Sequence, residues 1–274
     1  MTQPISFVSG RTQRNALPSL TPQFKQTVPL SLYVHIPWCV RKCPYCDFNS
    51  HAAPEVLPET MFVDALLEDL TRSLPAIWGR RVETVFFGGC TPSLLSPESV
   101  DRLLSGFRTL LPLSPGAEIT LEANPGTVDS ARFEGFRAAG INRLSLGIQS
   151  FDDAALQSLG RIHNKAQAIA AIEAAARVFD TFNLDLMVGL PYQTVDAALA
   201  DIEQALYFSP PHFSCYQLTL EPHTRFAAQP PAGLPDDDVC AEIQDQLEAR
   251  LADAGYDHYE TSAFARPGRQ CRPN

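Results

Sequence analysis

Residues 32–50 read LYVHIPWCVRKCPYCDFNS and carry three cysteines, Cys39, Cys43 and Cys46, directly after an apolar run. The apolar run has the β-branched and aromatic composition of a strand, and Pro37 ends it because proline cannot extend a ladder. We therefore expect the cysteines on a loop at the carboxyl end of a first strand. Thiolates bind soft metals and iron–sulfur clusters, and a cubane cluster normally takes four of them. Three thiolates leave one iron open for chemistry.

A structural zinc site is the alternative interpretation of the same cysteines. Its fourth ligand would be remote in the chain, at Cys90, Cys271 or His35. Zinc ribbons usually present two paired C-x2-C knuckles, and the sequence has no second pair. The spacing therefore favours an iron–sulfur cluster over zinc.

Composition limits the class of protein. The 274 residues suffice for one large α/β domain, and a net charge of −10 argues against a general nucleic-acid surface. No run reaches the roughly 18 apolar residues of a membrane span. Seven cysteines without framework spacing predict a reducing compartment, in which thiols bind metals or pack and do not form disulfides.

The N-terminal segment differs from the rest of the chain. Residues 1–30 contain no Asp or Glu and many Ser, Thr, Gln and Pro, which is too little apolar patterning to fold. An organellar transit peptide is the alternative, but four prolines interrupt any amphipathic helix. We expect a disordered tail on a cytoplasmic protein.

Beyond residue 30, strand-like and helix-like segments alternate. The expected strands cover residues 32–36, 83–87, 118–122, 143–148, 183–188 and 214–219. The expected helices cover residues 59–74, 97–110, 130–139, 153–159 with 165–179, and 195–207. Ser96 and Thr194 have the side chains of helix N-caps. Six such units predict an α/β fold, a partial (β/α)6 TIM-like barrel over residues 31–274, with ligands at the carboxyl ends of its strands.

Several residues at these strand ends are suited to binding a ligand. Gly88 and Gly89 let the backbone approach a ligand closely. Asp185 lies within an apolar strand, where an unpaired carboxylate would be costly, so we expect it to have a functional partner. The other polar candidates are Glu122, Gln149 and Arg161.

The cysteine loop, with an aromatic residue at Tyr45, resembles the radical S-adenosylmethionine (SAM) superfamily. The resemblance implies a [4Fe-4S] cluster on Cys39, Cys43 and Cys46, whose open iron chelates SAM and which, once reduced, cleaves it to a 5′-deoxyadenosyl radical. It also implies SAM contacts at Tyr33, Tyr45, Gly88, Gly89, Cys90, Thr91, Glu122, Gln149, Arg161 and Asp185. Cys90 replaces the third glycine of the family's G-G-G-T-P motif. If that position needs a positive φ or a close contact, its Cβ costs about 1 kcal/mol or more, and we expect weaker SAM binding.

The flanks of the loop resemble the branch that contains oxygen-independent coproporphyrinogen III oxidases and HemW-like haem chaperones. The oxidases carry a further cysteine where this chain has Phe48, and HemW-like proteins carry phenylalanine there. The resemblance implies a haem chaperone whose partners are haem or a porphyrin, haem-accepting proteins and an electron donor. The alternatives are oxidative decarboxylation of coproporphyrinogen III, which Phe48 disfavours, and a non-enzymatic zinc or electron-transfer protein.

The C-terminal residues depart from the HemW-like pattern. Those proteins continue with a His-Asn-x-x-Tyr-Trp segment linked to haem binding and then a further domain. Pro273 stands at the position of that histidine, and proline has no imidazole to ligate iron. We expect the barrel and cluster loop to form without the further domain and haem binding to be impaired.

Overall fold

The computed structural model describes residues 28–77 and 79–272. The expected disordered tail therefore lies outside the described residues up to residue 27, as does Pro273. The division into a tail and a single barrel domain stays a prediction.

Parallel strands form the body of one sheet, in the order β1-β4-β5-β6-β7-β8. Their bounds are β1 (Leu30–Ile36), β4 (Val82–Gly89), β5 (Leu113–Ala123), β6 (Arg143–Gln149), β7 (Phe182–Val188) and β8 (His212–Gln217). An antiparallel hairpin, β9 (Asp257–Glu260) and β10 (Ala263–Ala265), continues the sheet beyond β8. Within the described part of the chain β1 and β9 are the free edges, so the barrel stays open. The predicted partial (β/α)6 barrel is confirmed.

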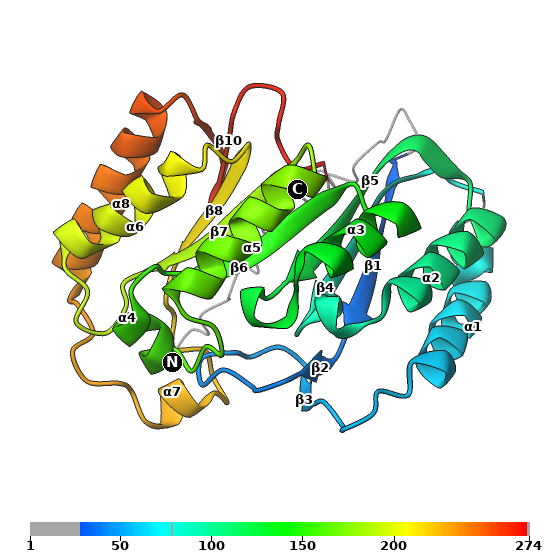
Figure 1. Ribbon diagram of the computed structural model, residues 1–274, viewed down its shortest axis with the longest axis horizontal. Helices are drawn as coiled ribbons and strands as arrows, with labels where there is room; N and C mark the ends of the chain where they lie inside the picture. The colour runs from blue at the N-terminus through cyan, green and yellow to red at the C-terminus, as the bar shows by residue number, and fades with distance from the viewer. Residues whose placement is uncertain (1–27, 78, 273–274) are drawn as a thin grey trace, which may run out of the picture.

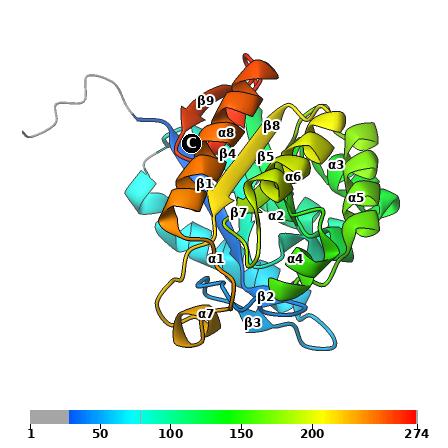
Figure 2. The same ribbon diagram turned by 90° about the vertical axis from the view of Figure 1, so that its left-hand side faces the viewer.

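Helices connect the strands and lie side by side around the outside of the sheet (Figure 1). Contacts join α1 to α2, α2 to α3, α3 to α5, and α6 to α8. The helices are α1 (Glu59–Ile77), α2 (Pro97–Leu110), α3 (Ser130–Ala139), α4 (Asp153–Ser158), α5 (Lys165–Val178), α6 (Val195–Tyr207), α7 (Arg225–Ala228) and α8 (Asp237–Asp253). A separate short pair, β2 (Trp38–Cys39) and β3 (His51–Ala52), lies at the same end of the molecule as α7 (Figure 2).

The expected helix caps are present. The Ser96 hydroxyl accepts a hydrogen bond from the Ser99 backbone N–H at 3.2 Å, at the start of α2. The Thr194 hydroxyl accepts one from the Ala197 backbone N–H at 3.2 Å, at the start of α6. Each bond satisfies an N–H group that the first turn of a helix leaves without a partner.

Side chains alternate between the two faces of the sheet because successive strand residues point in opposite directions. In β7, Leu184 and Leu186 are buried in the core that the helices cover, whereas Asp185 and Met187 line a cavity on the other face. The polar or small inward residues of the neighbouring strands are Glu122, Ser145, Gly147 and Gln149. One face of the sheet thus supplies stability and the other supplies polar groups for a ligand.

Two strands, β5 and β8, differ most from the prediction. β5 begins at Leu113, because Leu113 pairs with Val82 across an irregularity, although Pro115 and Gly116 are poor strand residues. β8 begins at His212 and ends at Gln217, and its early residues pair with the unpredicted β10. Short strands of this kind carry too little periodicity to be identified from sequence.

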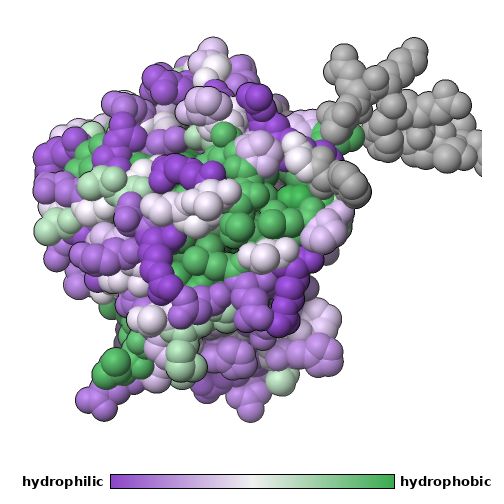
Figure 3. Space-filling view, turned by 90° about the vertical axis from the view of Figure 1, so that its right-hand side faces the viewer, coloured by the Kyte–Doolittle hydropathy of each residue, from purple (hydrophilic) through white to green (hydrophobic). Residues whose placement is uncertain are grey.

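A second cavity of about 190 Å³ lies between β1 and α1. Its apolar lining includes Leu30, Leu32, Leu66 and Leu70. Figure 3 shows apolar side chains gathered on this side of the molecule. Among the described residues none of the helices combines the length and the hydropathy that a bilayer span requires.

Candidate functional site

A cavity of about 420 Å³ opens at the carboxyl ends of the parallel strands. Pockets of this size commonly bind small molecules and cofactors. The residues predicted from sequence that line it are Cys39, Cys43, Tyr45, Cys46, Gly89, Cys90, Thr91, Glu122, Gln149, Arg161 and Asp185. The structure therefore brings together residues that are spread over most of the chain. Their roles as ligands stay predictions.

Two predicted residues, Tyr33 and Gly88, do not line this cavity, and Tyr33 lines the second one. Tyr33 is 57% exposed, and its ring stacks on that of Phe86 at 6.2 Å. A Cβ on Gly88 would lie 2.7 Å from the Tyr33 ring. Gly88 therefore makes room for an aromatic side chain and does not itself face the ligand space.

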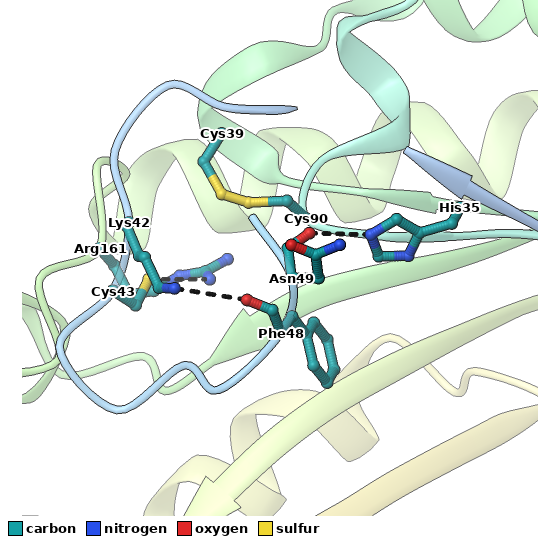
Figure 4. The surroundings of a disulfide bond; sticks show 8 residues. All are labelled: His35, Cys39, Lys42, Cys43, Phe48, Asn49, Cys90 and Arg161. Atoms are coloured by element: carbon teal, nitrogen blue, oxygen red, sulfur yellow. Dashed lines mark hydrogen bonds between the residues drawn. A yellow bond between two sulfur atoms is a disulfide. The ribbon is translucent and has the colours of Figure 1, made fainter. Parts of the chain in front are cut away.

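The cysteine loop is held at both of its ends. The Cys39 carbonyl accepts a hydrogen bond from the Ala53 N–H at 2.8 Å, which continues the pairing of β2 with β3. The His35 Nε2 lies 2.9 Å from the Asn49 carbonyl oxygen, and Lys42 Nζ donates to the Phe48 carbonyl at 3.3 Å (Figure 4). The loop is thus positioned by hydrogen bonds to its backbone, and these bonds do not use the cysteine side chains.

Cys39 is joined to Cys90 by a disulfide, as Figure 4 shows. The prediction that the thiols form no disulfides is therefore wrong for this pair. Its physical cause is the pairing of β1 with β4, which places Ile36 opposite Gly89 and lets the Cys90 N–H donate to the Ile36 carbonyl at 2.9 Å. Residues that follow the two strands therefore meet, although 51 positions separate them in sequence.

The cysteines have the donor chemistry of an iron–sulfur site. Cys43 and Cys46 are free thiols, and both line the same cavity as Cys39. Among the described residues no three His, Cys, Asp or Glu side chains converge on one point that would hold a metal ion. The set fits a [4Fe-4S] cluster on condition that Cys39 is released from Cys90, because a disulfide sulfur is not a thiolate ligand.

The turn after β4 requires glycine at Gly89 but not at the next position. Gly89 has φ of +115°, and a Cβ there would lie 2.6 Å from the Ile36 carbonyl oxygen. Positive φ at non-glycine residues, within the described ranges, occurs at Gln149, Tyr192, Ser209 and His223. Cys90 is not among them, so the backbone strain considered for it does not arise. Its effect on SAM affinity stays a prediction.

Two partly buried carboxyl groups, Glu122 and Asp185, line the same cavity as the cysteine loop. Burial and the nearby Asp185 raise the pKa of Glu122 to about 8. A hydrogen bond from the Gly89 N–H partly opposes this rise. Burial raises the pKa of Asp185 to about 6, although hydrogen bonds from Asn183 at 2.6 Å and Ser145 at 3.2 Å lower it. A cationic ligand between them would favour both ionised forms, because opposite charge stabilises a buried carboxylate.

Gln149 occupies a strained position at the end of β6. Its φ is 68°, which is unfavourable for a residue with a Cβ, and the pairing of β6 with β7 is irregular between Gly147 and Gln149. The Tyr216 hydroxyl donates to Gln149 Oε1 at 2.7 Å and fixes the amide beside the cavity. Sequence reasoning missed Tyr216. The signal was its position in β8, two residues after Ser214, which pairs with Asp185 across the sheet.

Arg161 is a partly buried cation beside Cys43. Its Nη1 lies 3.8 Å from Cys43 Sγ, and its Nη2 donates to the Gly147 carbonyl at 2.8 Å. Burial opposes the charged form, but Tyr45 and Cys43 outweigh it and raise the pKa of Arg161. Within the described residues its Nε has no hydrogen-bond partner. A cation with a spare donor at this point favours an anionic group in the cavity.

The radical SAM superfamily model matches residues 33–205. The chain belongs to the radical SAM superfamily. Membership implies a [4Fe-4S] cluster and SAM as cofactors. A solved radical SAM enzyme, the coproporphyrinogen III oxidase HemN from Escherichia coli, superposes with a TM-score of 0.79 at 30% identity, over 88% of this chain and 56% of HemN.

Radical SAM relatives of higher identity include haem chaperones. The haem chaperone HemW of Escherichia coli is 53% identical over 247 residues, which cover 90% of this chain and 65% of HemW. A mitochondrial radical S-adenosyl methionine domain-containing protein 1 from Mus musculus is 42% identical, over 87% of this chain and 54% of the mouse protein. This chain therefore spans about two thirds of the length of HemW.

Proposed function

We propose that this chain is the radical SAM part of a haem chaperone similar to HemW. Cys39, Cys43 and Cys46 hold the cluster, and SAM binds in the cavity beside them. The observation that carries the proposal is that one cavity is lined both by all three loop cysteines and by the polar strand ends opposite them. The 53% identity to a protein named as a haem chaperone supports the chaperone role.

The residues of the chain have distinct parts in this proposal. When bound and reduced, the cluster supplies the electron for cleavage of SAM. The Gly89 turn gives the SAM amino group access to backbone carbonyl oxygens. Glu122 and Asp185 accept hydrogen bonds from the ligand's hydroxyl or ammonium groups, and their raised pKa values fall as the cation arrives. Arg161 balances the negative charge of the Cys43 thiolate.

Haem or a porphyrin is the proposed cargo, and haem-accepting proteins are the proposed recipients. An electron donor reduces the cluster, and the cytoplasm is the proposed location because cysteine-bound clusters require reducing surroundings. These parts of the proposal rest on the relatives' names and concern the whole protein.

Coproporphyrinogen III oxidation is the second candidate function. The superposition with HemN favours it. Phe48 opposes it, because a phenyl ring cannot replace the additional thiol that the oxidases carry at this position. Phe48 lines the cavity and is 53% exposed, so a thiol there would face the ligand space.

Anaerobic reconstitution separates these candidates. After complete reduction of the protein, iron and sulfide analysis should give about four of each per chain, and SAM should bind. Coproporphyrinogen III should then remain unchanged, and titrated haem should bind this chain more weakly than a version extended with the His-Asn-x-x-Tyr-Trp segment. Turnover of coproporphyrinogen III would establish the oxidase instead. Bound zinc without sulfide would contradict the radical SAM proposal.

A further inference from the structure

Cys90 has a thiol that neither the fold nor the proposed SAM site requires. Its φ is not positive, so the position does not require glycine, and its N–H donates a hydrogen bond to the Ile36 carbonyl. Its sulfur is bonded to Cys39, one of the three loop cysteines. We infer that Cys39 and Cys90 form a reversible oxidation site whose disulfide prevents the loop from taking up its cluster. The inference rests on the proposed function in that Cys39 is taken as a cluster ligand.

The backbone holds the two cysteines at a distance that suits a disulfide. Their Cα atoms lie 5.4 Å apart, within the usual range of about 4.4–6.8 Å. Cys39 is anchored through its carbonyl to Ala53, and Cys90 through its N–H to Ile36. Both anchors belong to strand pairings, so oxidation and reduction change one covalent bond without a rearrangement of the sheet.

The other cavity cysteines do not compete for Cys90. Cys43 and Cys46 are free thiols, and Cys43 lies against Arg161 on the other side of the loop. Figure 4 shows the Cys39 and Cys90 sulfurs facing one another, with Cys43 pointing away from them toward Arg161. The geometry therefore favours Cys90 as the oxidation partner of Cys39 over Cys90 as a fourth cluster ligand.

The reaction needs an oxidant, and a small-molecule disulfide such as oxidised glutathione supplies it. Cys39 is 4% exposed and Cys90 is half-buried, so the Cys90 thiolate is the first of the two to reach the oxidised glutathione. The Cys90 thiolate bonds to one glutathione sulfur and expels the other as a thiolate. The Cys39 thiolate then attacks the Cys90 sulfur and releases the second glutathione. The two cysteines lose two protons and two electrons, and one oxidised glutathione becomes two reduced molecules.

Oxidation removes one of three ligands and leaves Cys43 and Cys46. A cluster with an open iron requires three thiolates, so uptake should stop until excess thiol reverses the exchange. In a reducing compartment the pair would stay reduced and would oxidise only when the ratio of oxidised to reduced glutathione rises.

The test uses the full 274-residue chain as wild type, as Cys90→Ser and as Cys240→Ser. Cys240 lies in α8, outside the cavity lining, and serves as the matched control for loss of one thiol. Each protein is equilibrated with oxidised or reduced glutathione, freed of it, and given iron and sulfide anaerobically without added thiol. Bound iron and sulfide are measured, and peptide mass mapping locates disulfides.

We expect oxidised wild type and oxidised Cys240→Ser to lose most of their iron uptake and to yield the Cys39–Cys90 linked peptide. Oxidised Cys90→Ser should take up as much iron as its reduced form. Equal uptake by oxidised and reduced wild type would overturn the inference alone. Lower uptake by reduced Cys90→Ser would also overturn it, because Cys90 would then be a cluster ligand.

Failure of the proposed function has a different signature. No cluster in any reduced sample would contradict the proposed function and the inference together, and the mass mapping would still report whether the disulfide forms. The two failures are therefore told apart by the reduced samples.

Discussion

The two sides of the cavity are held in different ways. The cysteine side, which consists of Cys39, Cys43, Cys46 and Cys90, lies on loops fixed by main-chain hydrogen bonds and one disulfide. The carboxylate side, which consists of Glu122, Gln149, Asp185 and Tyr216, lies on strands, and partly buried side-chain hydrogen bonds hold Asp185, Gln149 and Tyr216. The state of the first side changes with oxidation and that of the second with protonation. Redox conditions and pH should therefore each change a different side of the same cavity.

The largest effect is expected on the cysteine side. Cys43→Ala removes a proposed cluster ligand, so iron content after reduction and reconstitution should fall from about four per chain to near zero. Cys240→Ala, outside the cavity, should keep full loading. Iron and sulfide analysis gives the result. Full loading of Cys43→Ala would show that Cys43 is not a cluster ligand.

A smaller effect is expected when the carboxylate side loses a charge. Glu122→Gln should weaken SAM binding roughly tenfold or more, because a charge-assisted hydrogen bond becomes a neutral one. Calorimetric titration of the reconstituted protein measures the affinity. Glu118→Gln is the matched control, since Glu118 lies in the same strand but does not line the cavity. If Glu122→Gln also lost its cluster, the two sides would not be separable.

In the absence of ligand, the raised pKa values of the carboxylate side should make the free energy of unfolding depend on pH. Folded Glu122 keeps its proton up to a pKa of about 8, whereas the unfolded chain releases it near 4.5. The folded state therefore binds more protons between these values, and the free energy of unfolding should fall as pH rises. Asp185 acts in the same direction up to its pKa of about 6.

Urea denaturation of the reduced chain at about pH 5 and about pH 8 measures this dependence. Wild type should lose about 2 kcal/mol or more relative to Glu122→Gln over this interval, because glutamine does not titrate. The comparison with the variant cancels the opposite contributions of buried histidines such as His163 and His212, whose pKa values burial lowers. Equal changes in both proteins would mean that Glu122 ionises as an exposed glutamate does.

The smallest effect concerns the point where the two sides meet. Cys90→Gly restores the glycine of the family motif and should tighten SAM binding a few-fold in the reduced protein, because a side chain leaves the cavity wall. The gain is small because Cys90 has no strained backbone to relieve. Equal affinities would show that the turn tolerates the side chain.

Local spacing made the cysteine side predictable, because its three loop cysteines lie within eight residues of one another. The strand ends were also predictable as places for a ligand, and Glu122, Gln149 and Asp185 lie there. The Cys39–Cys90 bond was not, because it depends on the register that places Ile36 opposite Gly89. The strain at Gln149 and the contact from Tyr216 likewise arise only when β6, β7 and β8 pair. Such features follow from register between distant segments, which residue spacing does not encode.

The cavity draws residues from the loop after β1 and from β8, and this span has a consequence during synthesis of the chain. The loop cysteines leave the ribosome long before Tyr216, and at about 5–20 residues per second the interval is on the order of ten seconds or more. Arg161 and Cys90 also emerge after the loop. During this time the thiols have neither Arg161 beside them nor the later strands that complete the cavity. The nascent chain is therefore expected to be most vulnerable to oxidation and to stray metal ions before its last parallel strand pairs.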